Sequence, residues 1–145
     1  MTTSSRPQMP PIADEAGMAD LLAEQVIGVL CSHNPDGTIH AAPTYFLHED
    51  GLYVMGTQDG SQRVKNLRRD PRATLLVERR QEPYRSVTVY GRAEVLPGDL
   101  ERRIRILERV SPREEAEQFA GWLAAEWGLI EIRLHPQRLV TVDYS

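Results

Sequence analysis

The sequence of 145 residues has one cysteine and one lysine, and both scarcities exclude kinds of protein. A lone cysteine, Cys31, cannot build a disulfide framework or a cysteine-based metal site, and its apolar neighbours are typical of a buried structural thiol. The four histidines show no metal-ligand spacing. The net charge of −4 disfavours nucleic acid as a partner, because domains that bind nucleic acid are usually basic.

Long hydrophobic runs are also missing. No stretch approaches the ~20 apolar residues of a membrane span, and residues 1–17 contain no hydrophobic segment of a secretory signal. We therefore expect no membrane partner and a cytoplasmic location. Residues 1–12 are polar and proline-rich, which predicts a disordered tail followed by one domain over residues 13–145.

Short apolar runs between turn signals predict a mainly β protein. Strands are expected at 26–33, 38–48, 52–57, 72–78 and 85–96, and at 130–134 and 140–144, which we expect to form a hairpin around HPQR. NPDG and HEDG supply turns at 34–37 and 48–51. Because these connections are short, we expect antiparallel pairing in an α+β fold, a closed or split β-barrel with helices packed outside.

Two residues interrupt the strand pattern. Gly91 is expected to bend or bulge its strand. Pro43 cannot donate a hydrogen bond to a neighbouring strand, so it marks either an edge of the sheet or a break that exposes backbone groups to a ligand.

Four helices are expected, at 14–24, 61–70, 98–110 and 111–128. In the third, the spacing of Leu100, Ile104 and Leu107 predicts one buried face. The fourth is expected to open with a capping box, SPRE at 111–114. Its expected apolar face consists of Ala116, Phe119, Ala120, Leu123 and Trp127.

The stretch GSQRVKNLRRDPR, residues 60–72, holds five of the 17 basic residues of an acidic chain, which indicates a small anionic ligand. Ser61 is the expected N-cap, so the first amides, near Gln62 and Arg63, are free to bind an anion. The Arg63 guanidinium matches phosphate geometry, and Lys65 is the second candidate. The remaining arginines, Arg68, Arg69 and Arg72, are expected to be surface cations.

Motifs for a nucleophile elbow, a P-loop or a dinucleotide fingerprint do not occur in the sequence. Because the sequence shows no motif that supplies a nucleophile, an enzyme with this sequence would need a cofactor for its chemistry.

The segment DGLYVMGTQDGSQRVKNLRRDPRATLLVE resembles the core of the pyridoxamine-phosphate-oxidase-like split β-barrels, and most of all their flavin/deazaflavin oxidoreductases that use coenzyme F420. Three parts of the sequence carry the resemblance. The first is the run of Ser61, Arg63, Asn66, Leu67, Pro71 and Ala73, the second is the strand RSVTVYGRAEVL, and the third is the turn PDGTIHAAP.

This resemblance implies a homodimer with cofactor sites at the subunit interface. It assigns Arg63 as the phosphate-binding cation, where many members have lysine, with Ser61 and Gln62 beside it. The other implied cofactor contacts are Pro43, Thr44 and Tyr45 along the ring system, Met55, Gly56 and Thr57 under the ribityl chain, and Arg85 and Ser86 nearby.

The implied cofactor is F420, with FMN as the alternative. F420 carries an anionic oligoglutamate tail that Lys65, Arg68 and Arg69 could attract. The implied activity is transfer of a hydride from the reduced deazaflavin to a small-molecule substrate. Two alternatives stay open. One is an FMN-dependent oxidoreductase of the pyridoxamine-phosphate-oxidase type, although the sequence has no second basic cluster as dense as the first for a substrate phosphate. The other is a flavin-binding protein without turnover, because the motif has no obvious acid or base and only Tyr45 suggests itself as a proton donor.

Overall fold

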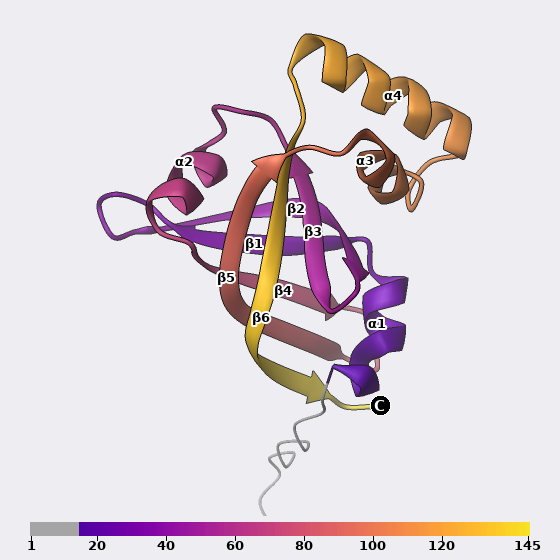
Figure 1. The fold of residues 1–145 in the computed structure, drawn as a ribbon. Coiled ribbons are helices and arrows are strands. Elements are labelled where there is room, and N and C mark those ends of the chain that lie inside the picture. The colour runs from indigo at the N-terminus through magenta and orange to yellow at the C-terminus, as the bar shows by residue number, and fades with distance from the viewer. Residues whose placement is uncertain (1–14) are drawn as a thin grey trace, which may run out of the picture.

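A computed structural model describes residues 15–145, and the tail predicted over residues 1–12 lies outside them. The six strands in this part are β1 (Ile27–His33), β2 (Ile39–Glu49), β3 (Leu52–Thr57), β4 (Arg72–Arg79), β5 (Arg85–Pro97) and β6 (Ile130–Asp143). They close into an antiparallel barrel in the order β1-β2-β3-β6-β5-β4 (Figure 1). The predicted antiparallel barrel with outer helices is confirmed.

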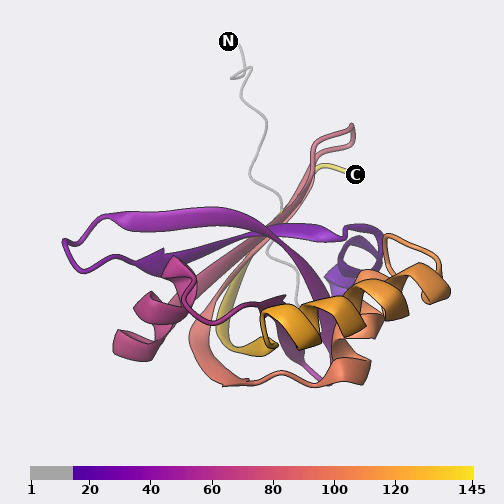
Figure 2. The same ribbon diagram turned by 90° about the horizontal axis from the view of Figure 1, so that it is seen from above.

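The helices lie around this barrel. A short 3₁₀ helix (Ala16–Met18) leads into α1 (Ala19–Glu24), and these are followed by α2 (Gln62–Arg69), α3 (Leu100–Leu107) and α4 (Arg113–Glu126). Figure 2 shows α3 and α4 side by side, away from α2. None of the helices within residues 15–145 is long and apolar enough to cross a membrane.

Alternation along the strands builds the core. Leu30, Leu75, Val87 and Val89 point into the barrel, and each is at most 1% exposed. The 3₁₀ helix and α1 add apolar side chains to the same core, namely Met18, Leu21 and Leu22. The β2–β3 hairpin turns on Asp50 and Gly51, whose φ angles of 54° and 74° suit the twist of the flanking strands.

The C-terminal segment differs from the prediction, because β6 is one continuous strand and not a hairpin. It pairs with β5 along its whole length, from Ile130 opposite Pro97 to Asp143 opposite Arg85. The register shifts beside Gly91, so the residues around HPQR are absorbed by a bulge and make no turn. The predicted irregularity at Gly91 is therefore confirmed, while the strand count falls from seven to six.

Gly91 permits this bulge by its lack of a side chain. A Cβ at position 91 would overlap the backbone carbonyl of His135. Such a close approach between two strands is available only to glycine.

The buried faces predicted for α3 and α4 are confirmed only in part. Ile104, Leu107, Ala116 and Ala120 form a small core between α3 and α4, as expected. Leu100 is 47% exposed, because it is the first residue of α3 and lies outside this contact. The large aromatic residues predicted on the buried face of α4 are likewise exposed, Phe119 by 49% and Trp127 by 56%.

The caps of these two helices also differ from expectation. The capping box at Ser111 was wrong, because α4 begins at Arg113 and no side chain caps it. Asp99 instead caps α3, where its carboxylate accepts a hydrogen bond of 2.9 Å from the Arg102 amide.

Candidate functional site

The first turn of α2 presents free backbone donors beside two hydroxyl groups. Ser61 is the N-cap, as predicted, and its hydroxyl oxygen accepts from the Val64 amide at 3.4 Å. The Thr57 hydroxyl, at the end of β3, donates to the same oxygen at 3.3 Å. Helix geometry leaves the amides of Gln62 and Arg63 without an intrahelical acceptor, so this end of the helix can bind an anion.

Arg63 adds a guanidinium to that end. The side chain is half-buried, and its Nη2 donates to the carbonyl oxygen of Pro43 at 3.4 Å. Within residues 15–145, no carboxylate lies within ion-pairing distance of Arg63. Burial lowers the pKa of Arg63, because desolvation disfavours the charged form. A half-buried cation without a counter-charge is the arrangement that a bound anion would complete.

The other cations of the basic stretch are exposed, as predicted. Arg68 pairs with Asp59 at 3.0 Å, and Arg72 pairs with Asp70 at 2.6 Å. Arg69 donates to the carbonyl oxygen of His33. The side chain of Lys65 is exposed to solvent. Arg63 is therefore distinguished from its neighbours by its burial.

A pocket in front of Arg63 gathers half of the residues predicted for the site. Its walls come from β2, β3, α2, α3 and α4, and no aspartate or glutamate lines it. The predicted residues that it joins are Pro43, Thr44, Tyr45, Gly56, Thr57 and Arg63. Ser61 lies beside it through its contact with Thr57.

Of the two interpretations of Pro43, the structure supports the sheet edge, since β2 runs unbroken from Ile39 to Glu49. β2 pairs with β3 only from Phe46 to Glu49, so Pro43 lies where β2 is a free edge and needs no donor there. Its carbonyl oxygen is at the same time the acceptor for Arg63.

Several predicted site residues are not among those that line the pocket. Met55 is fully buried in the barrel core. Gln62 is exposed and donates to the Asn66 side chain at 2.8 Å, and Lys65 is exposed. The contacts predicted between these residues and a cofactor stay predictions.

Arg85 and Ser86 begin β5, opposite the last residues of β6. The Arg85 side chain is only 7% exposed, and it pairs with Asp20 at 2.8 Å and with Asp143 at 3.2 Å. Ser86 is buried beside it. Arg85 thus links α1 to the C-terminal end of β6 through these two ion pairs. It does not line the pocket that contains Arg63.

Sequence reasoning missed a second guanidinium in the pocket, that of Arg103 on α3. Its Nη2 donates to the carbonyl oxygens of Thr57 at 2.9 Å and Ile130 at 3.0 Å. Burial lowers the pKa of Arg103, and the nearby charge of Glu131 opposes that shift. The signal was Gly56, since a glycine inside a strand often marks the close approach of another group, and here a Cβ would overlap the Arg103 guanidinium.

Part of the basic motif serves the fold and not a ligand. Asn66 is fully buried, and its Nδ2 donates to the Ser32 hydroxyl at 3.1 Å and to the side-chain Oδ1 of Asn34 at 2.9 Å. Leu67 and Ala73 are buried in the core. These residues hold α2 against the barrel, which leaves Ser61 and Arg63 as the ligand-facing part.

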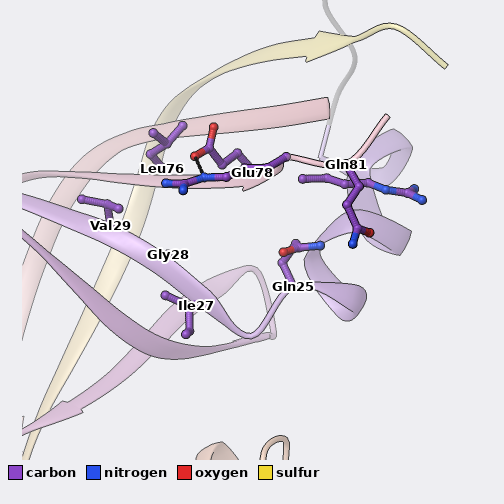
Figure 3. A pocket seen from close by; sticks show the side chains of 9 residues that line it. Gln25, Ile27, Gly28, Val29, Leu76, Glu78 and Gln81 are labelled. Carbon is purple, nitrogen blue, oxygen red and sulfur yellow. Dashed lines mark hydrogen bonds and ion pairs between the residues drawn. The ribbon is translucent and has the colours of Figure 1, made fainter. Parts of the chain in front are cut away.

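A second hollow lies between the ends of β1 and β4 (Figure 3). Its cations are already paired, Arg80 with Glu78 at 2.9 Å and Arg79 with Glu24 at 3.6 Å. Ile27, Val29 and Leu76 supply apolar walls. This groove therefore lacks the unpaired charge that marks the pocket at Arg63.

Comparison with known proteins gives one family match and many similar folds. A family model described as pyridoxamine 5'-phosphate oxidase matches residues 15–143. The conserved hypothetical protein Rv2991 from Mycobacterium tuberculosis has a structure with a TM-score of 0.78 at 26% identity, and the match covers 97% of this chain and 90% of that one. None of the curated proteins matches this chain.

Two more distant structures share the fold. A protein from Listeria innocua described as a putative pyridoxamine 5'-phosphate oxidase has a TM-score of 0.67 at 21% identity, with 88% of this chain and 96% of that chain covered. A protein described as an F420 reductase has a TM-score of 0.65 at 19% identity, with 83% and 93% covered.

Proposed function

The chain belongs to the pyridoxamine 5'-phosphate oxidase family, and we propose that it binds the phosphate of coenzyme F420 at Arg63 and acts as an F420H2-dependent reductase. The observation that carries this proposal is the half-buried Arg63 guanidinium, which has no carboxylate partner in residues 15–145 and lies at the free amides of α2. A phosphate there would accept charge-assisted hydrogen bonds from the guanidinium and from the helix start.

The pocket offers both kinds of contact that a flavin-type group needs, namely donors for a phosphate and a strand segment for the ring system. Arg63, Ser61 and the first amides of α2 would hold the phosphate, and the β2 segment from Pro43 to Tyr45 would lie along the ring system. When bound, the reduced deazaflavin supplies a hydride. The chain itself would bind and orient both reactants, and the apolar side chains of Phe119 and Leu123 would cover one side of them.

Two features favour F420 over FMN within this proposal. Lys65 and Arg69 are exposed on α2, the helix that begins at the phosphate site, and neither has a carboxylate partner in residues 15–145, so their charges are not neutralised and can attract an anionic tail. The F420 reductase with a similar fold is consistent with this choice.

The alternative is a flavin-binding protein without turnover. Among the residues that line the pocket, Tyr45 is the only ionisable side chain besides the two arginines. Hydride transfer to an acceptor is completed by a proton, which Tyr45 or water would have to provide. The two functions differ in turnover. An enzyme would catalyse the oxidation of F420H2 by an added acceptor, whereas a flavin-binding protein would bind the cofactor without doing so.

We also propose a homodimer, because the outer face of the β1–β2 ribbon is apolar. Four cross-strand pairs point outward on this face, namely Ile27 with Tyr45, Val29 with Pro43, Cys31 with Ala41, and His33 with Ile39. Ile27 is 47% exposed and Ile39 is 53% exposed. Since Pro43 and Tyr45 also line the pocket, a second copy on this face would cover the cofactor.

Titration with FMN and riboflavin, which differ only by the phosphate, tests the phosphate site. We expect FMN to bind at least about tenfold more tightly than riboflavin, and Arg63→Ala to weaken FMN by about 1.5–3 kcal/mol while leaving riboflavin unchanged. Arg72→Ala is the matched control, because its guanidinium is exposed and paired with Asp70. Fluorescence quenching gives each dissociation constant.

Equal losses of FMN affinity in the two variants would refute the phosphate assignment. The same titration with F420 compares the two cofactors directly, and tighter binding of FMN than of F420 would favour the flavin alternative.

A further inference from the structure

We propose that the Arg103 end of the pocket is a second anion subsite, which takes the carboxylate of a flat, apolar substrate. This inference rests on the proposed function, since it assumes that a cofactor phosphate occupies the Arg63 end. Both guanidinium groups line the same pocket, Arg63 from α2 and Arg103 from α3.

The Arg103 guanidinium is held in place with donors to spare. Its Nη2 is committed to the carbonyl oxygens of Thr57 and Ile130, and the group lies against Gly56. Its Nη1 has no hydrogen-bond partner within residues 15–145. A donor fixed before the ligand arrives costs little ordering entropy on binding, which is the property of a preorganised site.

The charges around Arg103 leave it without a full counter-ion. The charge of Glu131 acts on Arg103, but the Glu131 carboxylate already accepts from Arg102 at 2.7 Å and from Arg133 at 2.6 Å. No acid lines the pocket, so a phosphate held at Arg63 would leave Arg103 without an anion in direct contact. A second anionic group therefore has a place to bind. A carboxylate carries the single negative charge that would balance the single charge of the Arg103 guanidinium, and its oxygen can accept from the free Nη1.

The walls beside Arg103 define the rest of the ligand. Ile106, Leu107 and Leu123 line this end of the pocket, and Phe119 extends it. Phe119 is 49% exposed and stacks on Trp122 with ring centroids 6.0 Å apart, so its ring is held as a flat apolar wall. An aromatic or conjugated carboxylic acid combines the charge for Arg103 with a planar body for Phe119.

Cinnamate and cinnamamide test the subsite, because they share a shape and differ in charge. With the FMN-loaded full chain, we expect cinnamate to bind at least about tenfold more tightly than cinnamamide. Arg103→Gln should abolish that preference. Phe119→Ala should weaken both compounds alike, and should leave the fold intact because the side chain is half-exposed. Thermal unfolding of each variant checks the fold.

Equal binding of the two compounds to the unaltered chain would overturn the proposal. The proposal would also be wrong if Arg103→Gln lowered FMN affinity as much as Arg63→Ala does, since Arg103 would then belong to the phosphate site. Failure of the proposed function has a different signature. In that case Arg63→Ala would bind FMN as tightly as the unaltered chain does. The affinity of the FMN-free chain for cinnamate would still depend on Arg103.

Discussion

The guanidinium of Arg103 lies directly against Gly56, so closely that a Cβ at position 56 would overlap its Nε and Cζ atoms. This contact joins α3 to the end of β3, and the hydrogen bonds of Arg103 extend it to the start of β6. Thr57, which Arg103 holds by its carbonyl, is also the residue whose hydroxyl reaches the Ser61 cap of α2. One glycine thus allows a residue of α3 to support the anion site.

Gly56→Ala is expected to destabilise the chain by about 1–3 kcal/mol, because the methyl group displaces Arg103 from its two carbonyl acceptors. The free energy of unfolding in urea measures this loss. Gly121→Ala is the control, since a Cβ at that exposed helical position meets nothing within 4 Å. The control should gain about 0.5–1 kcal/mol, and equal effects in the two variants would contradict the contact.

Acid stability should depend on Asp20, whose pKa is held below its usual value mainly by hydrogen bonds from Arg85 at 2.8 Å and 3.1 Å. A carboxyl with a lowered folded pKa stabilises the fold above its unfolded pKa, and that stability is lost as the pH falls through the folded value. We therefore expect Asp20→Asn to lower the urea midpoint near neutral pH and to flatten its decline below about pH 4.

The matched control for Asp20 is the Arg85→Met background. There the carboxylate has lost its partner, so Asp20→Asn should no longer change the acid limb of the stability curve. A change of the same size in both backgrounds would show that the pair does not act as the structure suggests.

The outer face of the β1–β2 ribbon should determine the oligomeric state. We expect the full chain to scatter light with twice the mass of one chain, and Ile39→Lys to give the mass of one chain, because it places a charge in an apolar contact. Val110→Lys, at another exposed apolar residue outside this face, should remain dimeric. A monomer in the unaltered chain would remove the dimer proposal.

Cofactor choice should appear in the salt dependence of binding. If Lys65, Arg68 and Arg69 hold an anionic tail, F420 affinity should fall more steeply with salt than FMN affinity, since these contacts are exposed. Changing all three to alanine should weaken F420 several-fold and leave FMN nearly unchanged. Because Arg68 already pairs with Asp59, we expect Lys65 and Arg69 to contribute most.

The control for the tail replaces the exposed residues Arg72, Arg80 and Arg92, which carry the same total charge away from the pocket. If that variant weakened F420 as strongly, the effect would be one of net charge, and the tail assignment would be wrong.

Local sequence determined much of this molecule. The alternation of apolar residues placed the first five strands, and Asp50-Gly51 fixed the β2–β3 turn. Ser61 specified the start of α2 and Asp70 its end. The motif around Arg63 also predicted the family, which the match over residues 15–143 confirms. Each of these features depends on residues within a few positions of one another, where backbone sterics and side-chain capping act directly.

Tertiary structure decided the features that depend on distant partners. The HPQR segment has turn chemistry, yet β5 offers it a full-length pairing with a bulge at Gly91, and a continuous ladder prevails over the local preference for a turn. Arg85 was predicted near the cofactor, but pairing with Asp20 and Asp143 holds it away from the pocket at Arg63. Arg103 entered the pocket because α3 packs across the end of β3. A sequence encodes such contacts only through the closed barrel, whose geometry brings together residues separated by dozens of positions.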